Sequence, residues 1–242
     1  MTSDNVVTTV VNRHLCCGCG VCAGVCPSRV LIMDWNRFGE LNPALSGDCK
    51  PACSACLSAC PFAPGNPDED EIGRDLFAAH ADMSHDPILG FYRGTYAGYS
   101  VSADLRENGA SGGLATWIVE TMLRTGSIDT VLCVGQHGGA GRLFSYSAVS
   151  DPGDVRRSSR SAYYPVELSE ALRLIGTTPG RYAVSALPCV AKGIRLAASK
   201  RKSIRERLIA IIGLTCGQMK SAYFTGYMAA RAGLTGPPRL VN

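Results

Sequence analysis

The stretch Cys16-Cys17-Gly18-Cys19-Gly20-Val21-Cys22-Ala23-Gly24-Val25-Cys26-Pro27 decides how the first part of this chain folds. It opens a segment in which nine of the chain's 12 cysteines fall, between Cys16 and Cys60. Residues 1–15 contain neither a basic start nor an unbroken apolar stretch, so no secretion signal is evident and we expect a cytoplasmic protein. Thiols crowded together in a reducing compartment indicate metal binding rather than disulfides.

The spacing of these cysteines indicates two iron–sulfur half-sites. The first run reads Cys16-x2-Cys19-x2-Cys22-x3-Cys26-Pro27, and the second reads Cys49-x3-Cys53-x2-Cys56-x3-Cys60-Pro61 with one extra residue. In bacterial two-cluster ferredoxins, the fourth cysteine of each run binds the other cluster. We therefore predict two 4Fe-4S clusters, one held by Cys16, Cys19, Cys22 and Cys60, the other by Cys49, Cys53, Cys56 and Cys26.

Two points in this interpretation have alternatives. A zinc site is one, but zinc favours two CxxC pairs or added histidines rather than a tight quartet followed by proline. The other concerns Cys17, which we interpret as a spare thiol because only Cys16 completes the x2 spacing. An exchange of roles between Cys16 and Cys17 stays open at this point.

Length and composition favour a small module followed by a larger domain. The chain has 242 residues, 46% hydrophobic and 18% charged, as expected of a folded protein. A proline-rich and acidic stretch follows Pro61, so we expect a two-cluster ferredoxin-type domain at 1–65, a linker arm at 66–93 and a further domain at 94–242. No segment approaches the roughly 18 apolar residues of a membrane span.

The charge pattern gives little support to nucleic-acid binding. The formal net charge is +4, and positive charge gathers in one short segment of Lys200, Arg201, Lys202, Arg205 and Arg207. We interpret this segment as a solvated helix face, with docking of an acidic partner or an anionic cofactor as the alternative. Without interleaved aromatic residues or a reading motif, we expect no nucleic-acid partner.

The larger domain is predicted to be α/β, with a mostly parallel or mixed sheet. Residues 108–113 form a glycine-rich loop that leads into apolar residues at helical spacing, and 130–135 is a continuous apolar run typical of a buried strand. Residues 182–187 and 208–214 repeat one design, in which a strand leads through a cysteine, Cys189 or Cys216, toward a helix. The smaller module before it is predicted to be a bacterial-ferredoxin-like α+β fold.

Cys189 and Cys216 are candidate site residues because the carboxyl ends of parallel strands form the ligand crevice in such sheets. Each could instead be a small packing residue or an inert thiol; a third metal site, a redox thiol pair and contact with a cofactor also remain open. Cys133 lies inside a predicted strand and is expected in the core. The Ser111-Gly112-Gly113 loop is either a tight turn or a phosphate-binding helix start.

The motifs together resemble those of the coenzyme F420 hydrogenase/dehydrogenase beta-subunit family. The resemblance covers residues 14–234 and rests on the double cluster motif and on four later segments. These segments are Ala110-Ser111-Gly112-Gly113-Leu114-Ala115-Thr116, Ser161-Ala162-Tyr163-Tyr164-Pro165, Leu187-Pro188-Cys189 and Gly213-Leu214-Thr215-Cys216. Each late segment is weak alone, whereas the combination is specific.

The resemblance implies an oxidoreductase in which FAD exchanges a hydride with coenzyme F420 or another small organic partner and passes electrons to the iron–sulfur clusters. It implies a cofactor site made of Ser111, Gly112, Gly113, Thr116, Tyr163, Cys189 and Cys216. It also implies a redox partner protein or subunit. Family members continue beyond the equivalent of Gly233, whereas this sequence ends at Asn242, so we expect an incomplete C-terminal part.

Two other functions compete with this one. The chain could be a non-catalytic electron carrier or adaptor subunit without flavin, or a zinc-stabilised interaction protein. His14, His80, His85 and His137 are scattered without ligand spacing, so no hydrolase site is predicted, and the catalytic residues are left unassigned.

Overall fold

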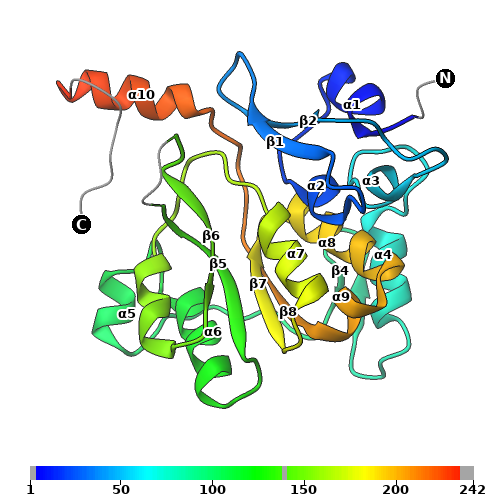
Figure 1. The fold of residues 1–242 in the computed structure, drawn as a ribbon. Coiled ribbons are helices and arrows are strands. Elements are labelled where there is room, and N and C mark those ends of the chain that lie inside the picture. The colour runs from blue at the N-terminus through cyan, green and yellow to red at the C-terminus, as the bar shows by residue number, and fades with distance from the viewer. Residues whose placement is uncertain (1–3, 138–140, 235–242) are drawn as a thin grey trace.

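The computed structural model describes residues 4–137 and 141–234 (Figure 1). Its N-terminal part combines short helices with one antiparallel hairpin, as predicted for a ferredoxin-like α+β module. The elements are α1 (Val6–Thr9), the 3-10 helix η1 (Val11–Arg13), α2 (Val21–Val25), β1 (Leu31–Trp35), β2 (Leu41–Leu45) and α3 (Ala55–Ser58). Helices α2 and α3 contain Cys22 and Cys56, so each cysteine run is folded around one short helix.

The segment between the two parts contains helix α4 (Glu69–Phe77), a short antiparallel hairpin of β3 (Ser84–Asp86) and β4 (Gly90–Tyr92), and then helix α5 (Ala103–Glu107). Helix α4 begins after Asp68, whose carboxylate accepts the amide proton of Glu71 while the Glu71 carboxylate accepts that of Asp68. This capping box fixes the start of the helix. Glu69 then lies 3.2 Å from the ammonium nitrogen of Lys192.

The remaining chain forms a four-stranded sheet with helices around it. The elements are α6 (Leu114–Arg124), β5 (Thr130–Gln136), β6 (Phe144–Val149), η2 (Pro152–Ser158), α7 (Ser169–Thr177), β7 (Tyr182–Ala186), α8 (Pro188–Lys200), α9 (Lys202–Arg207), β8 (Leu208–Gly213) and α10 (Ala222–Arg231). The strand order is β6-β5-β7-β8. β5, β7 and β8 run parallel, and β6 is antiparallel to β5. The predicted α/β class with a mixed sheet is confirmed.

Alternate side chains of the central strands enter two different cores. Val131 and Ala183 pack with α6 and η2 on one face, whereas their neighbours Leu132 and Val184 pack with α7 and α8 on the other. All four are at most 1% exposed. The sheet is therefore covered on both faces, which explains why its strands read as continuous apolar runs.

The N-terminal module shares the core on the α7 and α8 face. Val21 and Val25 of α2 belong to the same buried cluster as residues of α7, α8 and the sheet. Two glycines allow this close packing: a Cβ added to Gly24 would lie 3.1 Å from Leu172 Cβ, and one on Gly193 would lie 3.0 Å from Val21. Figure 1 shows α2 beside α7 and α8, so the cysteine-bearing loop lies directly against the α/β part.

Candidate functional site

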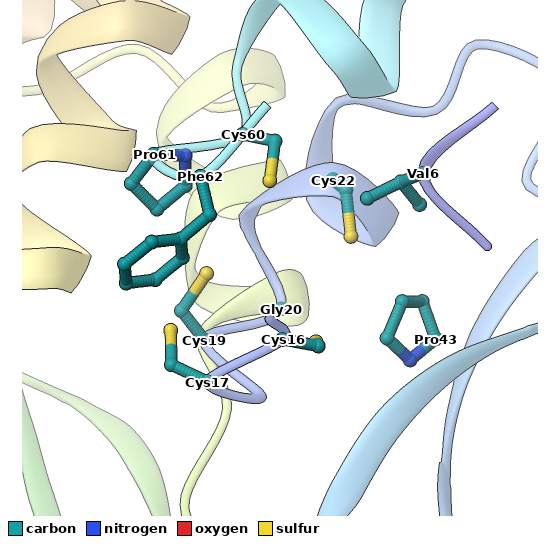
Figure 2. Close-up of a pocket in the computed structure, with 10 residues that line it drawn as sticks. All are labelled: Val6, Cys16, Cys17, Cys19, Gly20, Cys22, Pro43, Cys60, Pro61 and Phe62. Carbon is teal, nitrogen blue, oxygen red and sulfur yellow. The ribbon is translucent and has the colours of Figure 1, made fainter. Parts of the chain in front are cut away.

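Four of the predicted cluster ligands line one cavity. Cys16, Cys19, Cys22 and Cys60 are brought together there from α2, the loop before it and the end of the second cysteine run (Figure 2). The cavity is also lined by Val6, Cys17, Gly20, Pro43, Pro61 and Phe62. This is the set that the crossover rule assigns to one cluster, with Cys17 added.

The donor set fits a 4Fe-4S cluster, which takes four thiolates. The space now enclosed is small, about 10 Å³, so the side chains around it would have to turn outward to admit a cluster. Among the described residues no group of three or more His, Cys, Asp or Glu could hold a metal ion. A cubane cluster does not need such a group. Its four thiolates bind four different irons, so they surround a volume rather than converge on one point.

Burial sets the electrostatics of these thiols. Desolvation raises the pKa of Cys22 well above its ordinary value, and it raises the pKa of Cys16 and Cys60 as well. The amide of Gly18 opposes this for Cys16 by donating a hydrogen bond to its sulfur at 3.4 Å. Metal binding to such thiols must release protons, because only the thiolate is a ligand.

The second predicted ligand set is gathered around α3. Burial raises the pKa of Cys56, and the nearby Cys49 and Cys53 raise it further. Cys26 packs against the same buried cluster as Cys56. The structure thus brings Cys49, Cys53 and Cys56 together and places Cys26 on their shared core.

A partly buried ion pair joins the N-terminal hairpin to the segment before α7. Arg142 lies 3.0 Å from the carboxylate of Glu167 and donates a second hydrogen bond, also 3.0 Å, to the carbonyl of Met33 on β1. The Glu167 side chain is 6% exposed and also accepts the amide proton of Ser169. Arg142 therefore joins the N-terminal hairpin to the start of α7, a link that no sequence motif indicated.

Two further arginines bind the end of α2. The carbonyl oxygens of Ala23 and Val25 accept hydrogen bonds from Arg173 and Arg201, respectively. A helix end carries partial negative charge, so cations are favourable there. Arg207 similarly donates to the carbonyl of Ile175 at 2.9 Å. The basic segment predicted to be a solvated face therefore also has a structural role, through Arg201 and Arg207.

A larger cavity of about 580 Å³ lies at the carboxyl end of β5 and is bounded by β1, β6 and α7. It is lined by Asp34, Trp35, Leu41, His137, Gly141, Arg142, Phe144, Ser145, Tyr146, Val166, Glu167, Glu170 and Ala171. Its size is typical of small-molecule sites. The partly buried Tyr146 donates a 2.9 Å hydrogen bond to the carbonyl of Ser185, and desolvation raises the pKa of Tyr146.

Sequence reasoning missed this cavity, because its lining comes from separate segments of the chain. The lining residues that the structure describes include none of the seven residues predicted for the cofactor. The one available signal was the position of His137 directly after the β5 strand, at the edge where ligands of parallel sheets bind.

The predicted cofactor residues are placed in four different settings. The Ser111-Gly112-Gly113 turn begins α6, where Gly113 has φ +74° and an added Cβ would lie 2.4 Å from the carbonyl oxygen of Leu105. Thr116 is buried on α6, whereas Tyr163 is exposed. Cys216 is exposed after β8, and Cys189 lies at the start of α8, where it packs against the same core as Cys17.

The comparison with protein families decides the relationship of this chain to known proteins. The model of the coenzyme F420 hydrogenase/dehydrogenase beta subunit N-terminal region matches residues 95–173, and that of its C-terminal region matches residues 180–239. This chain belongs to the coenzyme F420 hydrogenase/dehydrogenase beta-subunit family. The predicted family is thus confirmed.

Individual relatives agree with membership of the beta-subunit family. A coenzyme F420-dependent sulfite reductase from Methanocaldococcus jannaschii is 24% identical over 188 residues, which cover 77% of this chain and 26% of that protein. The chain thus spans about a quarter of the length of this curated relative. A chain of the F420-reducing [NiFe] hydrogenase complex from Methanosarcina barkeri shares the fold, with a TM-score of 0.50 and 19% identity over 61% of this chain and 52% of that one.

Within the described residues, every helix is too short or too polar to cross a bilayer.

Proposed function

We propose that this chain binds two 4Fe-4S clusters and passes electrons between them and an organic cofactor held by the α/β part. The observation that carries the proposal is the cavity lined by Cys16, Cys19, Cys22 and Cys60, which come from both cysteine runs as the crossover rule requires. Cys26, Cys49, Cys53 and Cys56 are proposed to hold the second cluster, supported by the proximity of three of them around α3.

The packing of the cluster loop supports electron transfer into the α/β part. The carbonyl of Cys19 accepts a hydrogen bond from the amide of Leu168, and Cys17 packs against the same core as Cys189 of α8. The proposed cluster therefore lies against the segments that flank the carboxyl edge of the sheet. The clusters would supply one-electron steps there.

The organic cofactor is proposed to be FAD, with F420 as the hydride-exchanging co-substrate. Family membership supports this, because relatives are named for F420-dependent reactions. Ser111, Gly112, Gly113, Thr116 and Tyr163, with Cys189 and Cys216, remain the proposed flavin contacts. The cavity beside β5 is separate from these residues and offers two aromatic side chains, Trp35 and Phe144, to a planar ring.

A partner subunit is proposed to complete the electron path. One solved relative is a chain of a hydrogenase complex. Helix α10 also presents several exposed large apolar side chains, namely Tyr223, Phe224, Tyr227 and Met228. A row of apolar residues on an exposed helix is typical of a protein–protein contact.

Quantitation of iron, acid-labile sulfide and flavin in protein purified without oxygen tests the proposal. About eight irons and about one flavin per chain are expected, since two 4Fe-4S cubes contain that iron. Eight irons without flavin, even after FAD is added, would make the chain a non-catalytic electron carrier. Stoichiometric zinc in place of iron would reject the electron-transfer function.

A further inference from the structure

The cavity beside β5 has an aromatic wall that is built from segments far apart in the sequence. Trp35 at the end of β1 and Phe144 at the start of β6 both line it. Tyr164 contacts both rings, with its ring centroid 5.8 Å from that of Trp35 and 6.0 Å from that of Phe144. All three side chains are half-buried. Aromatic faces held in this way favour planar conjugated molecules as ligands.

A histidine–serine pair adds a hydrogen-bonding group to the same cavity. Nδ1 of His137 lies 3.0 Å from the hydroxyl oxygen of Ser145, and both residues line the cavity. The sheet fixes this pair, because the amide of His137 donates a 2.8 Å hydrogen bond to the carbonyl of Leu143, which makes Ser145 its diagonal neighbour on β6. Among the described residues none bonds Nε2 of His137, so this nitrogen is the one left for a ligand.

The charges around the cavity disfavour an anionic ligand. Arg142 is the one lysine or arginine among the described lining residues, and it is paired with Glu167 at 3.0 Å. Two further carboxylates, Asp34 and Glu170, line the cavity, and Glu170 is paired with Arg173. A phosphate or carboxylate group would therefore meet fixed carboxylates without a free cation to bind it.

We propose that the cavity beside β5 is a substrate site, separate from the proposed flavin contacts, for an uncharged planar conjugated molecule with a carbonyl group at its edge. The ring of this molecule stacks on Trp35 and Phe144. Its carbonyl oxygen accepts a hydrogen bond from Nε2 of His137, while the Ser145 hydroxyl donates to Nδ1 and so keeps the proton on Nε2. Lactones and quinones with fused rings belong to this chemical class.

This inference goes beyond the proposed function. FAD and F420 both carry phosphate, so the molecule in this cavity is a further organic ligand. Only its role as a substrate rests on the proposed oxidoreductase function. The binding itself requires neither clusters nor flavin, so it is testable whether or not the chain contains them.

Equilibrium dialysis with two matched probes tests the site in protein purified without oxygen. Coumarin is planar and uncharged and has a carbonyl at its edge, whereas coumarin-3-carboxylate differs by one group and is an anion at neutral pH. The proposal predicts saturable binding of coumarin and binding of the carboxylate that is weaker by about tenfold or more. Absence of saturable coumarin binding, or equal binding of the two probes, would overturn it.

Variants locate the bound probe. Trp35→Ala and His137→Ala should each weaken coumarin binding by about fivefold or more, because one removes a stacking face and the other a hydrogen bond. Trp117→Ala and His80→Ala are the matched controls, since both residues are exposed and lie outside the cavity lining, and they should bind coumarin like the parent. Parent-like binding in both cavity variants would overturn the proposal.

Two further outcomes separate this inference from the proposed function. Displacement of coumarin by added FAD would put both molecules in one site and would reject a separate substrate site. Coumarin binding as predicted, in protein that takes up no FAD, would reject the flavin of the proposed function and leave the cavity site standing. The comparison of the two probes uses the parent protein alone, so it decides the question even if a variant fails to fold.

Discussion

The backbone amide of Leu168 donates a 2.9 Å hydrogen bond to the carbonyl oxygen of Cys19. Leu168 immediately precedes α7 and is fully buried, whereas Cys19 lies in the middle of the first cysteine run. The bond therefore fixes the loop that presents the proposed ligands against the α/β part. The conformation of the cluster loop therefore depends on residues far along the chain. A substitution on either side of this contact should disturb both the cluster loop and the start of α7.

Replacing Gly20 by alanine should destabilise the protein by about 2–4 kcal/mol, combining left-handed backbone strain with overpacking. Gly20 has φ +78°, and an added Cβ would lie 2.4 Å from a Glu167 carboxylate oxygen and 2.9 Å from the Leu168 amide. Urea unfolding measures the effect. The matched control is Gly65→Ala, because Gly65 has φ +79° and nothing within 4 Å of an added Cβ. Equal losses for both variants would argue against the close contact at Gly20.

Truncation of Arg142 should weaken the link between the hairpin and α7. Arg142→Ala leaves the carboxylate of Glu167, which is 6% exposed, without its cation, so a loss of about 2–4 kcal/mol is expected from urea unfolding. Arg157→Ala removes a more exposed pair with Asp154 and should cost less than about 1 kcal/mol. A similar small loss at both positions would show that the Arg142 pair does not join the two parts.

The local elements were predictable from the sequence, because their signals are local. The run at 182–187 was predicted as a strand, and β7 spans Tyr182–Ala186; the run at 130–135 became β5, which spans Thr130–Gln136. Buried parallel strands are recognisable in a sequence as continuous apolar runs that are followed by glycine or proline. The antiparallel edge strand β6 was not predicted, since its burial is intermediate along most of its length.

Contacts between distant segments could not be predicted from the sequence. The bond of Arg142 to the carbonyl of Met33 and the packing of Cys17 and Cys189 against one core depend on how α7 and α8 pack on the N-terminal module. Side chains that bind backbone carbonyls leave no motif, because any residue supplies a carbonyl. The cavity beside β5 escaped prediction for the same reason: its lining is assembled by tertiary packing.

The ion pair between Asp129 and Arg181 should make stability depend on acid pH. The hydrogen bond from Arg181 holds the pKa of Asp129 below its ordinary value, so the pair stabilises the folded state above the unfolded pKa of about 4. This contribution is lost as the pH falls through the lowered folded pKa. Asp129→Asn should therefore lower the urea midpoint at pH 7, and the difference from the parent should shrink toward pH 3. A difference independent of pH would contradict the assignment.

Removing one proposed ligand of the second cluster should remove that cluster alone. Cys56→Ala is expected to lower the iron content from about eight to about four per chain, because each 4Fe-4S cube needs its full ligand set. Iron and acid-labile sulfide assays measure this. Cys133→Ala is the control, since Cys133 is buried inside β5 and belongs to neither cysteine run. Unchanged iron in Cys56→Ala would refute the ligand assignment.

A reductive titration tests most directly the claim that clusters and an organic cofactor share this chain. Protein purified without oxygen and supplied with FAD is titrated with dithionite while its visible and electron paramagnetic resonance spectra are followed. The account predicts uptake of about four electrons per chain, one for each of the two clusters and two for the flavin. Uptake of about two electrons, with cluster signals alone, would contradict flavin binding, and no uptake at all would contradict the electron-transfer function.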